Sequence, residues 1–382
     1  MERQAMSIRD VMTSPAIGRR NGLVFLADPH GRPSRVPGNL PGLLDGPREE
    51  VIVPAMEARR TDHRRWAIVL AAGSGTRLQA LARDRSGTAV PKQFCSLSGA
   101  RTLLGDALLR ARRVVPAKNV VVVVAAQHRE WWESELGDSP RENVIVQPEN
   151  RGTASGILLP LLSILERDRT ARVALLPSDH FVLEEPVLAR ALRQALKEAC
   201  DDQVALLGIT PDRAETEYGW IVPATRDAVA RVTTFVEKPA WTDAQSCLRS
   251  GGLWNSFILA AQAASLLELF AQRVPDLVAA FMEAFRAEDR RQALVDLYAR
   301  LESVDFSRAV LQGSEPSLRV HVVSPCGWTD LGTPERVEQC VNGLRSRRPT
   351  SPRRRSLNAP VNLRQLLQEQ TAYTPRSSRH VL

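Results

Sequence analysis

The amino-acid sequence predicts an α/β protein with a doubly wound, mostly parallel, Rossmann-like sheet and helices on both of its faces. Between residues 66 and 207, short apolar runs of strand length alternate with amphipathic segments of helix length. Repeated βαβ units of this size join parallel strands through helices that cover the sheet from both sides. After about residue 215 the segments become shorter and strand-like, so we expect a small strand-rich lobe beside the main sheet.

The strands of the first region are short apolar runs such as Ala67–Leu70 and Val120–Val124, which are too short for helices. Further strands are expected at 144–146, 172–176 and 203–207. Helices with one apolar face are expected at 102–113, 127–136, 153–167 and 186–199. The third of these helices contains Pro160, and Pro186 suits the first turn of the fourth.

The second region completes one predicted domain, residues 66–344. Strands are expected here at 218–223, 230–237, 254–259 and 318–324. Three helices are expected between residues 261 and 301, and a closing helix at 333–344.

The two ends of the chain differ from this domain in composition. Residues 1–65 are rich in Pro, Gly and Arg without periodicity, which predicts a disordered N-terminal extension; a translation start at Met56 is left open. Residues 345–382 include Arg353-Arg354-Arg355 among Ser and Pro, which predicts a basic disordered tail.

The formal net charge of +8 comes mainly from these ends. Residues 345–382 carry +8 and residues 1–65 carry +3, which leaves −3 for the predicted domain. The charge therefore gives no reason to expect a nucleic-acid partner. The longest apolar run, Val120–Ala126, is far too short to span a bilayer, so no membrane partner is expected.

The spacing of the cysteines and the sequence of the N-terminus indicate in which cellular compartment the protein is expected. The five cysteines are odd in number, widely spaced and free of C-x-x-C, so we interpret them as reduced thiols. No charged segment followed by an apolar segment opens the chain, so no secretory signal is expected. A cytoplasmic protein is the resulting prediction, and a homodimer is left open.

Small residues follow the first predicted strand directly: Ala71, Ala72, Gly73, Ser74, Gly75 and Thr76. Such residues let a ligand approach the backbone, whose N–H groups can hold an anion. Two cations come next, Arg77 and then Lys92 after Pro91. No Lys-Ser/Thr follows Gly75, so this is not a P-loop, and Leu78 replaces the third glycine of a dinucleotide fingerprint. The pattern indicates a nucleoside triphosphate site; an ordinary strand-to-loop turn is the alternative.

The string AAGSGTRL followed by VPKQF resembles the signature of the sugar-phosphate nucleotidyltransferases, and among them the mannose-1-phosphate guanylyltransferases (GDP-mannose pyrophosphorylases). Seven further motifs follow in that family's order over residues 66 to 340. They are QPENRGTA at 147–154, LLPSDH at 175–180, YGWIVP at 218–223, FVEKP at 235–239, LWNSF at 253–257, VDFSRAV at 304–310 and GWTDLG at 327–332.

The resemblance implies the transfer of a nucleotidyl group from an NTP, expected to be GTP, to a sugar 1-phosphate, expected to be mannose 1-phosphate, with release of pyrophosphate. A phosphate oxygen attacks the α-phosphorus, so the protein has to neutralise and align two polyanions and needs no nucleophile of its own. We therefore expect Arg77, Lys92 and Lys238 to be the catalytic cations, and Asp179 and Asp330 to hold Mg²⁺. His180 is interpreted as structural, because an attacking phosphate is already deprotonated.

The resemblance also implies two sets of binding residues. The nucleotide set is Ala71, Ala72, Gly73, Ser74, Gly75, Thr76, Arg77, Lys92, Thr153, Ala154 and Asp179. The sugar-phosphate set, which the strand-rich lobe should carry, is Gly219, Glu237, Lys238, Asn255 and Asp305. For Asn255 and Asp179, ordinary turn residues are the structural alternative.

The chain departs from the family pattern at two places near the expected base. Gly152 stands where the guanylyltransferases usually carry Asn, and Ala71-Ala72-Gly73 replaces Ala-Gly-Gly. Guanine preference therefore stays open, with Asn150 as a substitute for the missing side chain. Glucose-1-phosphate uridylyl- or thymidylyltransferase activity, a non-catalytic sugar-nucleotide-binding subunit and a glycosyltransferase are the alternatives.

Overall fold

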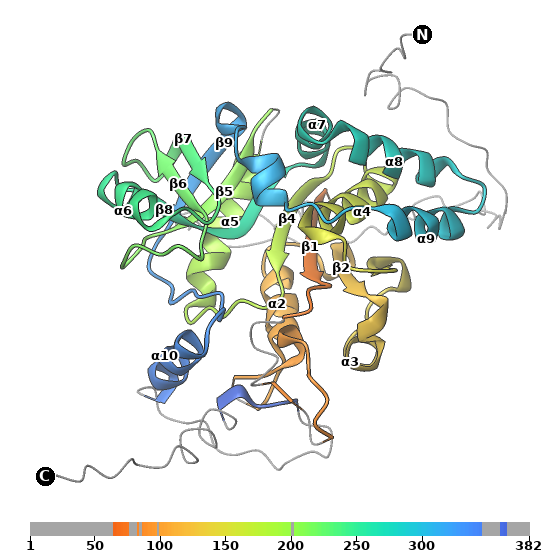
Figure 1. Cartoon of the computed structure of the whole chain (residues 1–382), viewed down its shortest axis with the longest axis horizontal. Helices are drawn as coiled ribbons and strands as arrows, with labels where there is room; N and C mark the ends of the chain where they lie inside the picture. The colour runs from red at the N-terminus through yellow and green to blue at the C-terminus, as the bar shows by residue number, and fades with distance from the viewer. Residues whose placement is uncertain are drawn as a thin grey trace, which may run out of the picture. The chain divides into compact units, whose positions relative to one another are not determined.

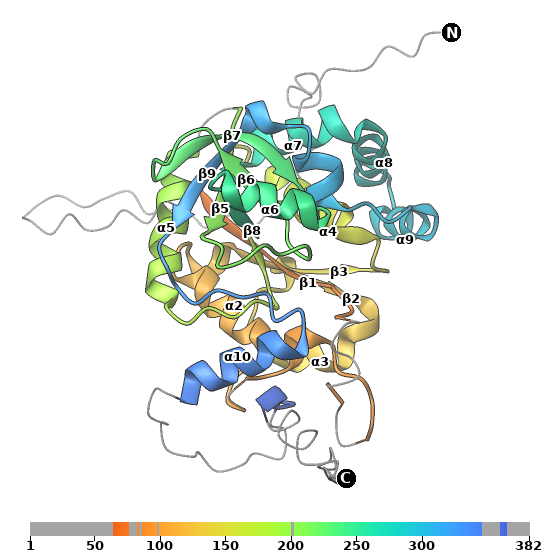
Figure 2. The ribbon, with the colours of Figure 1, turned by 60° about the vertical axis from the view of Figure 1, so that its left-hand side comes forward.

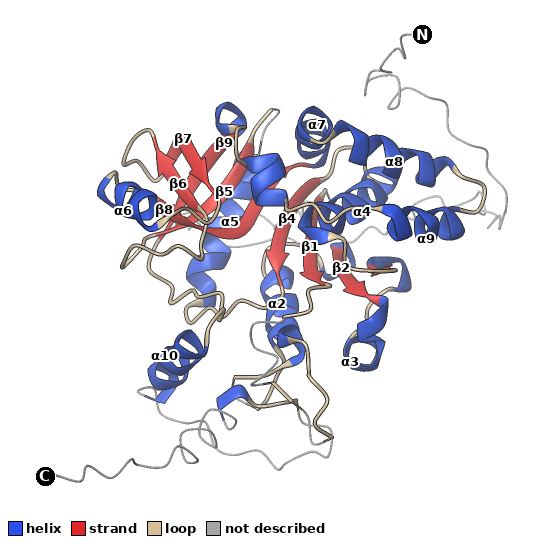
Figure 3. Cartoon of the chain, viewed as in Figure 1, coloured by secondary structure: helices blue, strands red, loops and turns tan. Residues whose placement is uncertain are grey.

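One mixed sheet of nine strands organises the residues that the structure describes (Figures 1 and 3). Its strand order is β3-β2-β1-β4-β8-β5-β9-β7-β6. The strands are β1 (Arg65–Ala71), β2 (Val120–Ala125), β3 (Val144–Gln147), β4 (Arg172–Pro177), β5 (Val204–Ile209), β6 (Trp220–Pro223), β7 (Val229–Val236), β8 (Leu253–Gln262) and β9 (Leu318–Val323).

The computed structural model describes residues 64–75, 82–83, 86–97, 99–199, 202–345 and 360–364. All of them belong to the second of two units, Thr61–Leu382. The expectations for residues 1–63, for Thr76 and Arg77, and for most of the tail lie outside the described residues. In the parts that are described, no helix is long and apolar enough to cross a membrane.

The expected parallel arrangement is found around β1. This strand pairs in parallel with β2 on one side and with β4 on the other, and β2 pairs in parallel with β3. All six residues of β2 are buried, as expected for a strand covered on both faces. The carboxyl ends of these four strands therefore meet at one edge of the sheet.

The described sheet is mixed: seven of its nine strands run in one direction, as a mostly parallel sheet requires, and β7 and β8 run against them. The strand β8 lies between β4 and β5 and is antiparallel to both, and β6 and β7 add further antiparallel pairs. An apolar run indicates burial, but it contains no signal for strand direction. The strand-rich lobe is likewise not separate, because β6 and β7 pair with β8 and β9 and extend the same sheet.

Helices cover both faces of the sheet, as predicted (Figures 1 and 2). One face packs against α2 (Leu103–Arg112), α3 (Arg129–Glu135), α5 (Glu185–Glu198), α6 (Trp241–Arg249) and α10 (Pro334–Arg345). The other packs against α4 (Gly152–Arg167), α7 (Ala263–Arg273), α8 (Pro275–Arg286) and α9 (Arg290–Arg300). Side chains of β1 alternate between these two cores: Ala67 and Val69 face the first, and Trp66 and Ile68 face the second.

Short helical turns join the main elements. They are η2 (Lys92–Phe94), η3 (Ala117–Asn119), η4 (Ala126–His128), η5 (Arg141–Asn143), η6 (Ser307–Leu311) and η7 (Glu315–Ser317). The predicted helix at 127–136 is divided between η4 and α3. Pro160 is tolerated inside α4, and Pro186 lies in the first turn of α5, both as predicted.

Residues 360–364 are an exception to the expectation of a tail without structure. The backbone of this segment pairs with Ser96: the Ser96 N–H donates to the Val361 carbonyl at 2.7 Å, and the Leu363 N–H donates to the Ser96 carbonyl at 2.9 Å. Leu363 is 2% exposed and joins the core that contains α2 and α10. A short piece of the tail is thus fixed directly behind the turn that carries Lys92.

Candidate active site

The loop after β1 is held by hydrogen bonds from the turn η2, which follows it in sequence. Gln93 is buried, and its Nε2 donates to the carbonyl oxygens of Ala71 at 3.0 Å and Gly73 at 2.8 Å. Gly75 has a φ of +59°, and a Cβ added there would come within 2.9 Å of the Lys92 backbone. Gly75 therefore has to be glycine for the protein to fold in this way. Gly73 is exposed and has no neighbour near its Cβ position.

Lys92 connects this loop to the two predicted metal ligands. Its Nζ donates to Asp179 Oδ2 at 2.8 Å and to the backbone carbonyl of Asp330. The side chain of Lys92 is only 7% exposed, whereas that of Asp179 is 36% exposed. Burial alone would raise the pKa of Asp179, but the ammonium of Lys92 and the nearby His180 hold this pKa at about 2. The carboxylate is therefore ionised at neutral pH.

The loops of Asp179 and Asp330 lie side by side. The N–H of Phe181 donates to the carbonyl of Thr329 at 2.9 Å, and the reverse bond is 3.0 Å long. Asp179 follows β4, and the Ser178 N–H still pairs with the Leu70 carbonyl of β1 at 3.0 Å. Two acidic residues separated by about half of the domain are thus fixed at the same edge of the sheet.

The carboxylate of Asp330 is held by three donors. Its Oδ1 accepts from the Tyr218 hydroxyl at 2.8 Å, from an Arg336 guanidinium N–H at 2.8 Å and from the Gly332 N–H at 2.9 Å. Burial opposes ionisation, but Lys92, His180 and Arg336 together lower the pKa of Asp330 below its ordinary value. Both predicted metal ligands are therefore ionised carboxylates.

His180 packs against Trp328, and its Nε2 lies 3.8 Å from Asp179 Oδ1. It is buried, and Trp328 Nε1 donates to its Nδ1 at 3.2 Å, with the two rings packed edge to face at 5.2 Å. Burial lowers the pKa of His180 to about 4, although Asp179 opposes this shift. The imidazole is therefore neutral at physiological pH.

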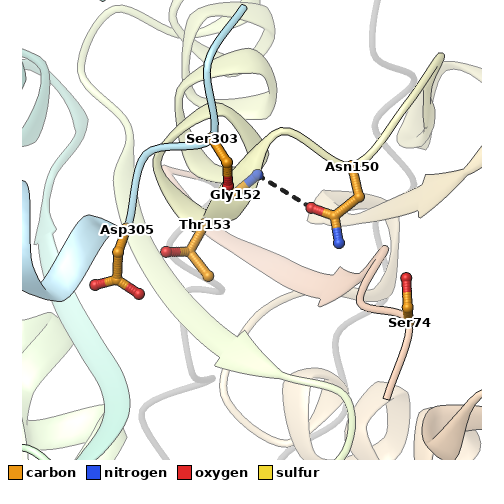
Figure 4. A pocket seen from close by; sticks show the side chains of 6 residues that line it. All are labelled: Ser74, Asn150, Gly152, Thr153, Ser303 and Asp305. Carbon is orange, nitrogen blue, oxygen red and sulfur yellow. Dashed lines mark hydrogen bonds between the residues drawn. The ribbon is translucent and has the colours of Figure 1, made fainter. Parts of the chain in front are cut away.

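A pocket of about 440 Å³ opens between the loop after β1, the start of α4 and the segment before η6 (Figure 4). Its lining consists of Ser74, Asn150, Gly152, Thr153, Ser303 and Asp305. The Oδ1 of Asn150 accepts the Gly152 N–H at 3.1 Å, which turns the amide nitrogen of Asn150 away from Gly152 (Figure 4). The pocket thus combines hydroxyl, amide and carboxylate groups from three distant segments.

The structure explains the unusual glycine at position 152. Gly152 has a φ of +82°, and a Cβ there would lie 2.4 Å from the Val304 carbonyl oxygen and 2.8 Å from Ser303 Oγ. The segment 303–306 packs directly on the start of α4. The Ala154 N–H donates to the Val304 carbonyl at 3.0 Å, and Thr153 Oγ1 accepts the Phe306 N–H at 2.7 Å.

Three of the predicted sugar-phosphate residues, Gly219, Glu237 and Asn255, lie in contact with one another. A Cβ on Gly219 would lie 2.5 Å from Glu237 Oε2 and 3.2 Å from Asn255 Cβ, so only glycine fits between them. The Asn255 N–H donates to the Gly219 carbonyl at 2.8 Å. Lys238 is exposed, with a φ of +49°.

Asp305 connects the two parts of the site. It lines the pocket of Figure 4, and its Oδ1 accepts the Arg308 N–H at 2.9 Å. Burial and the nearby charge of Asp305 raise the pKa of Glu237 to about 7, against the opposing effects of Lys238 and Arg308. Asp305 thus lines the pocket and also acts through its charge on Glu237 of the sugar-phosphate set.

The two aspartates fit a magnesium ion held mainly by substrate and water. Mg²⁺ commonly takes one or two protein carboxylates and completes its shell with waters and phosphate oxygens. Asp179 and Asp330 provide two ionised carboxylates next to a partly open edge. Among the described residues, no group of three or more His, Cys, Asp or Glu side chains forms a full metal cage.

Three contributors to this geometry were not singled out from the sequence. Gln93 lies in the VPKQF motif. Its hydrogen-bond partners, the carbonyls of Ala71 and Gly73, are twenty or more residues away in sequence. Tyr218 also lies in a motif, but Arg336 lies in none. The guanidinium of Arg336 contacts Glu215 Oε2 at 2.7 Å and lies 4.3 Å from the centre of the Tyr218 ring. No local pattern indicates such contacts.

A model of the nucleotidyl transferase family matches residues 66–346. The mannose-1-phosphate guanylyltransferase ManC of Salmonella typhimurium LT2 is 33% identical over an alignment of 287 residues, which covers 70% of this chain and 58% of ManC. The xanthan biosynthesis protein XanB of Xanthomonas campestris pv. campestris is 30% identical over 275 residues, 70% of this chain and 57% of XanB. The chain thus spans less than two thirds of the length of these curated relatives.

A similar solved structure comes from Thermus thermophilus and is described as a mannose-1-phosphate geranyltransferase. It is 30% identical to this chain with a TM-score of 0.62, and the match covers 70% of this chain and 76% of the solved chain. The α/β architecture is therefore shared with a solved relative.

Proposed function

The chain belongs to the nucleotidyl transferase family, whose model spans residues 66–346, and from this premise we propose that it transfers a nucleotidyl group from an NTP to a sugar 1-phosphate. GTP and mannose 1-phosphate are the proposed substrates, and GDP-mannose and pyrophosphate the products. The relative ManC is named for this activity. The name of XanB suggests that such a product serves polysaccharide biosynthesis.

The observation that carries this proposal is the position of Lys92. One buried ammonium contacts Asp179 and the Asp330 backbone while its own backbone supports Gly75 of the loop after β1. A phosphate chain placed over that loop would meet a cation and two ionised carboxylates at once. This is the combination that phosphoryl and nucleotidyl transfer require.

In the proposed reaction, a phosphate oxygen of the sugar 1-phosphate attacks the α-phosphorus of the NTP. The bond from the α-phosphorus to the oxygen that links it to the β-phosphorus breaks, and pyrophosphate leaves with that oxygen. Lys92 neutralises charge on the triphosphate, and Lys238 neutralises the sugar phosphate. Arg77, outside the described residues, is proposed as a second cation for the triphosphate. No protein group has to take a proton, in agreement with the neutral His180.

Asp179 and Asp330 are the proposed holders of Mg²⁺. When bound, the ion would neutralise phosphate charge and help to orient the triphosphate. The sugar is assigned to the groups around Gly219, where Glu237 accepts and the Asn255 amide both donates and accepts. The pocket lined by Asn150, Thr153 and Asp305 is assigned to the nucleoside, and Asn150 is the proposed substitute for the Asn that Gly152 replaces.

The experiment is a pyrophosphate-release assay on the full chain with Mg²⁺, in which four NTPs are crossed with mannose 1-phosphate and glucose 1-phosphate. Release with GTP and mannose 1-phosphate is expected. Release with a different pair would keep the reaction and change the substrates. If no pair reacts while the folded protein still binds a nucleotide sugar, the chain is a binding subunit and the proposed activity is wrong.

A single substitution separates catalysis from binding. Asp179→Asn keeps the size of the side chain and removes its charge, so turnover should fall by roughly 100-fold or more. A binding subunit would instead show altered affinity with no turnover to lose.

A further inference from the structure

The side chain of Gln93 contacts the loop after β1 at two alternate peptide groups. Its Nε2 carries two hydrogens, and they are donated to the carbonyl oxygens of Ala71 and Gly73. Gln93 is 3% exposed, so these bonds form where water does not compete. Both carbonyls are thereby turned toward the same side of the loop.

A planar trans peptide points its N–H opposite to its C=O. When Gln93 holds the carbonyls of Ala71 and Gly73, it turns the N–H groups of Ala72 and Ser74 toward the other side. Gly73 lies between these two groups, is exposed and has open space at its Cβ position. The side of the loop that faces away from Gln93 is therefore the side that a ligand can approach.

From this geometry we propose that Gln93 is a positioning residue for the nucleotide: it fixes the peptide planes of the loop so that their N–H groups face the NTP. This inference rests on the proposed function and assigns a role to a residue that contacts no substrate. Preformed N–H donors avoid the cost of reorganisation when an anion binds.

Lys92 and Gln93, which are neighbours in one turn, thereby have different roles. Lys92 points toward Asp179 and supplies charge, whereas its neighbour supplies no charge and sets backbone direction. A glutamate at 93 would have nearly the same shape, but its carboxyl group has no hydrogen when ionised and one when protonated, so it cannot donate to both carbonyl oxygens. The loop peptides would then have to rotate away.

The test compares Gln93→Glu with the wild-type full chain by calorimetric titration of GTP in the presence of Mg²⁺, and by KM for each substrate. The dissociation constant for GTP and its KM should rise by about tenfold or more, the effect expected when charge-assisted hydrogen bonds are lost. The KM for the sugar 1-phosphate should change by less than about twofold, because its groups lie around Gly219. A merely structural role would affect both substrates alike.

Gln147→Glu is the matched control. Gln147 is 1% exposed, and its Nε2 donates to the Tyr298 hydroxyl at 2.7 Å, a group that can reverse and donate to a carboxylate. This variant introduces the same buried carboxyl without touching the loop, so it should bind GTP like the wild type. Thermal unfolding of all variants shows whether each is folded.

The outcomes separate the two proposals. If wild type binds GTP and Gln93→Glu binds it equally well, the role of Gln93 is wrong and the proposed function stands. If wild type neither binds any NTP nor releases pyrophosphate, the proposed function fails and the role of Gln93 fails with it. Should Gln93→Glu not fold, Gln93→Asn, which is too short to reach both carbonyls, decides by the same comparison.

Discussion

At the scale of single residues, Gly73 and Gly75 of the loop after β1 are glycines for different reasons. Gly75 is required by the protein, because its φ is +59° and Lys92 lies where a Cβ would be. Gly73 has no such neighbour. A glycine that the folded protein does not need is explained most simply by a ligand that comes close to the backbone.

This contrast predicts opposite effects for the two alanine substitutions. Gly75→Ala should lower the free energy of unfolding by roughly 2 kcal/mol, through strain at positive φ and contact with Lys92. Gly73→Ala should leave stability within about 0.5 kcal/mol and raise the KM for the NTP by roughly tenfold. Chemical denaturation and steady-state kinetics measure the two effects. Equal loss of stability in both variants would contradict the assignment.

Glu237 gives a prediction on pH at the same scale. Its pKa of about 7 in the folded protein lies above the ordinary value of 4.5, because of burial and the charge of Asp305. The folded state therefore binds this proton more tightly than the unfolded state. Its contribution to stability is fully present below pH 4.5 and is lost as the pH rises toward 7. Glu237→Gln should flatten that part of the stability curve.

The same group should affect sugar binding. A carboxylate accepts a hydroxyl hydrogen better than a carboxylic acid does, so the KM for the sugar 1-phosphate should fall between about pH 6 and pH 8. The second ionisation of the substrate phosphate also changes this KM with pH in the same range. In the control variant Glu237→Gln, only the pH dependence caused by the substrate should remain. An unchanged pH profile in this variant would exclude Glu237 from sugar binding.

At the scale of elements, α10 holds the Asp330 loop in place through one residue. Arg336 is 5% exposed; it contacts Asp330 Oδ1 at 2.8 Å and Glu215 Oε2 at 2.7 Å, and it packs on the Tyr218 ring. Glu215 and Tyr218 lie just before Gly219 in the chain. One guanidinium therefore joins the predicted metal loop to the predicted sugar loop.

Arg336→Ala should destabilise the protein by about 3 kcal/mol, because it removes a buried guanidinium that two partly buried carboxylates share. It should also weaken Mn²⁺ binding, measured by electron paramagnetic resonance, and raise the KM for the sugar 1-phosphate. Arg290→Ala is the control: Arg290 forms a two-bond pair with Glu166, at 2.8 Å for each bond, but both side chains are nearly half exposed. That surface pair should contribute less than about 1 kcal/mol. Unchanged Mn²⁺ binding in Arg336→Ala would refute the link.

The elements also show what a sequence can and cannot predict. Apolar runs placed every strand of the first region. Burial on both faces explains the signal of β2 and β4, whereas the edge strand β3 is apolar although Val146 is exposed. The antiparallel direction of β8 is decided by its neighbours β4 and β5, so no local pattern predicts it. The helix α6 was missed because it buries only Ala244 and Cys247, too few positions for a periodic signal.

The site follows the same division. Motif residues such as Lys92 and Asp179 meet at the edge that the βαβ rule indicates. The partners of Gln93 and Arg336 are far away in sequence or outside any motif, so their roles required the structure. The close packing of residues 303–304 on Gly152 also joins segments that are far apart in sequence, so it could not be predicted from the sequence.

At the scale of the whole molecule, a segment from near the end of the chain supports the turn that carries Lys92. Residues 360–364 pair with Ser96, which lies four residues after Lys92, and Leu363 fills a site in the core. Gly99 is part of the same contact, since a Cβ there would lie 2.9 Å from Asn362 Nδ2. The position of Lys92 thus depends on residues far away in sequence.

Two truncations test this dependence. A chain that ends at Arg364 should keep wild-type stability and activity, whereas one that ends at Ala359 should lose roughly 2–3 kcal/mol of stability, mainly from the site of Leu363. The shorter chain should also show a raised KM for the NTP, because Lys92 and Gln93 lose support on one side. Leu363→Ala in the full chain should reproduce most of the loss of stability. If both truncations have the same unfolding temperature and kinetics, the segment does not support the turn, and the position of Lys92 is set by Asp179 and the Asp330 backbone alone.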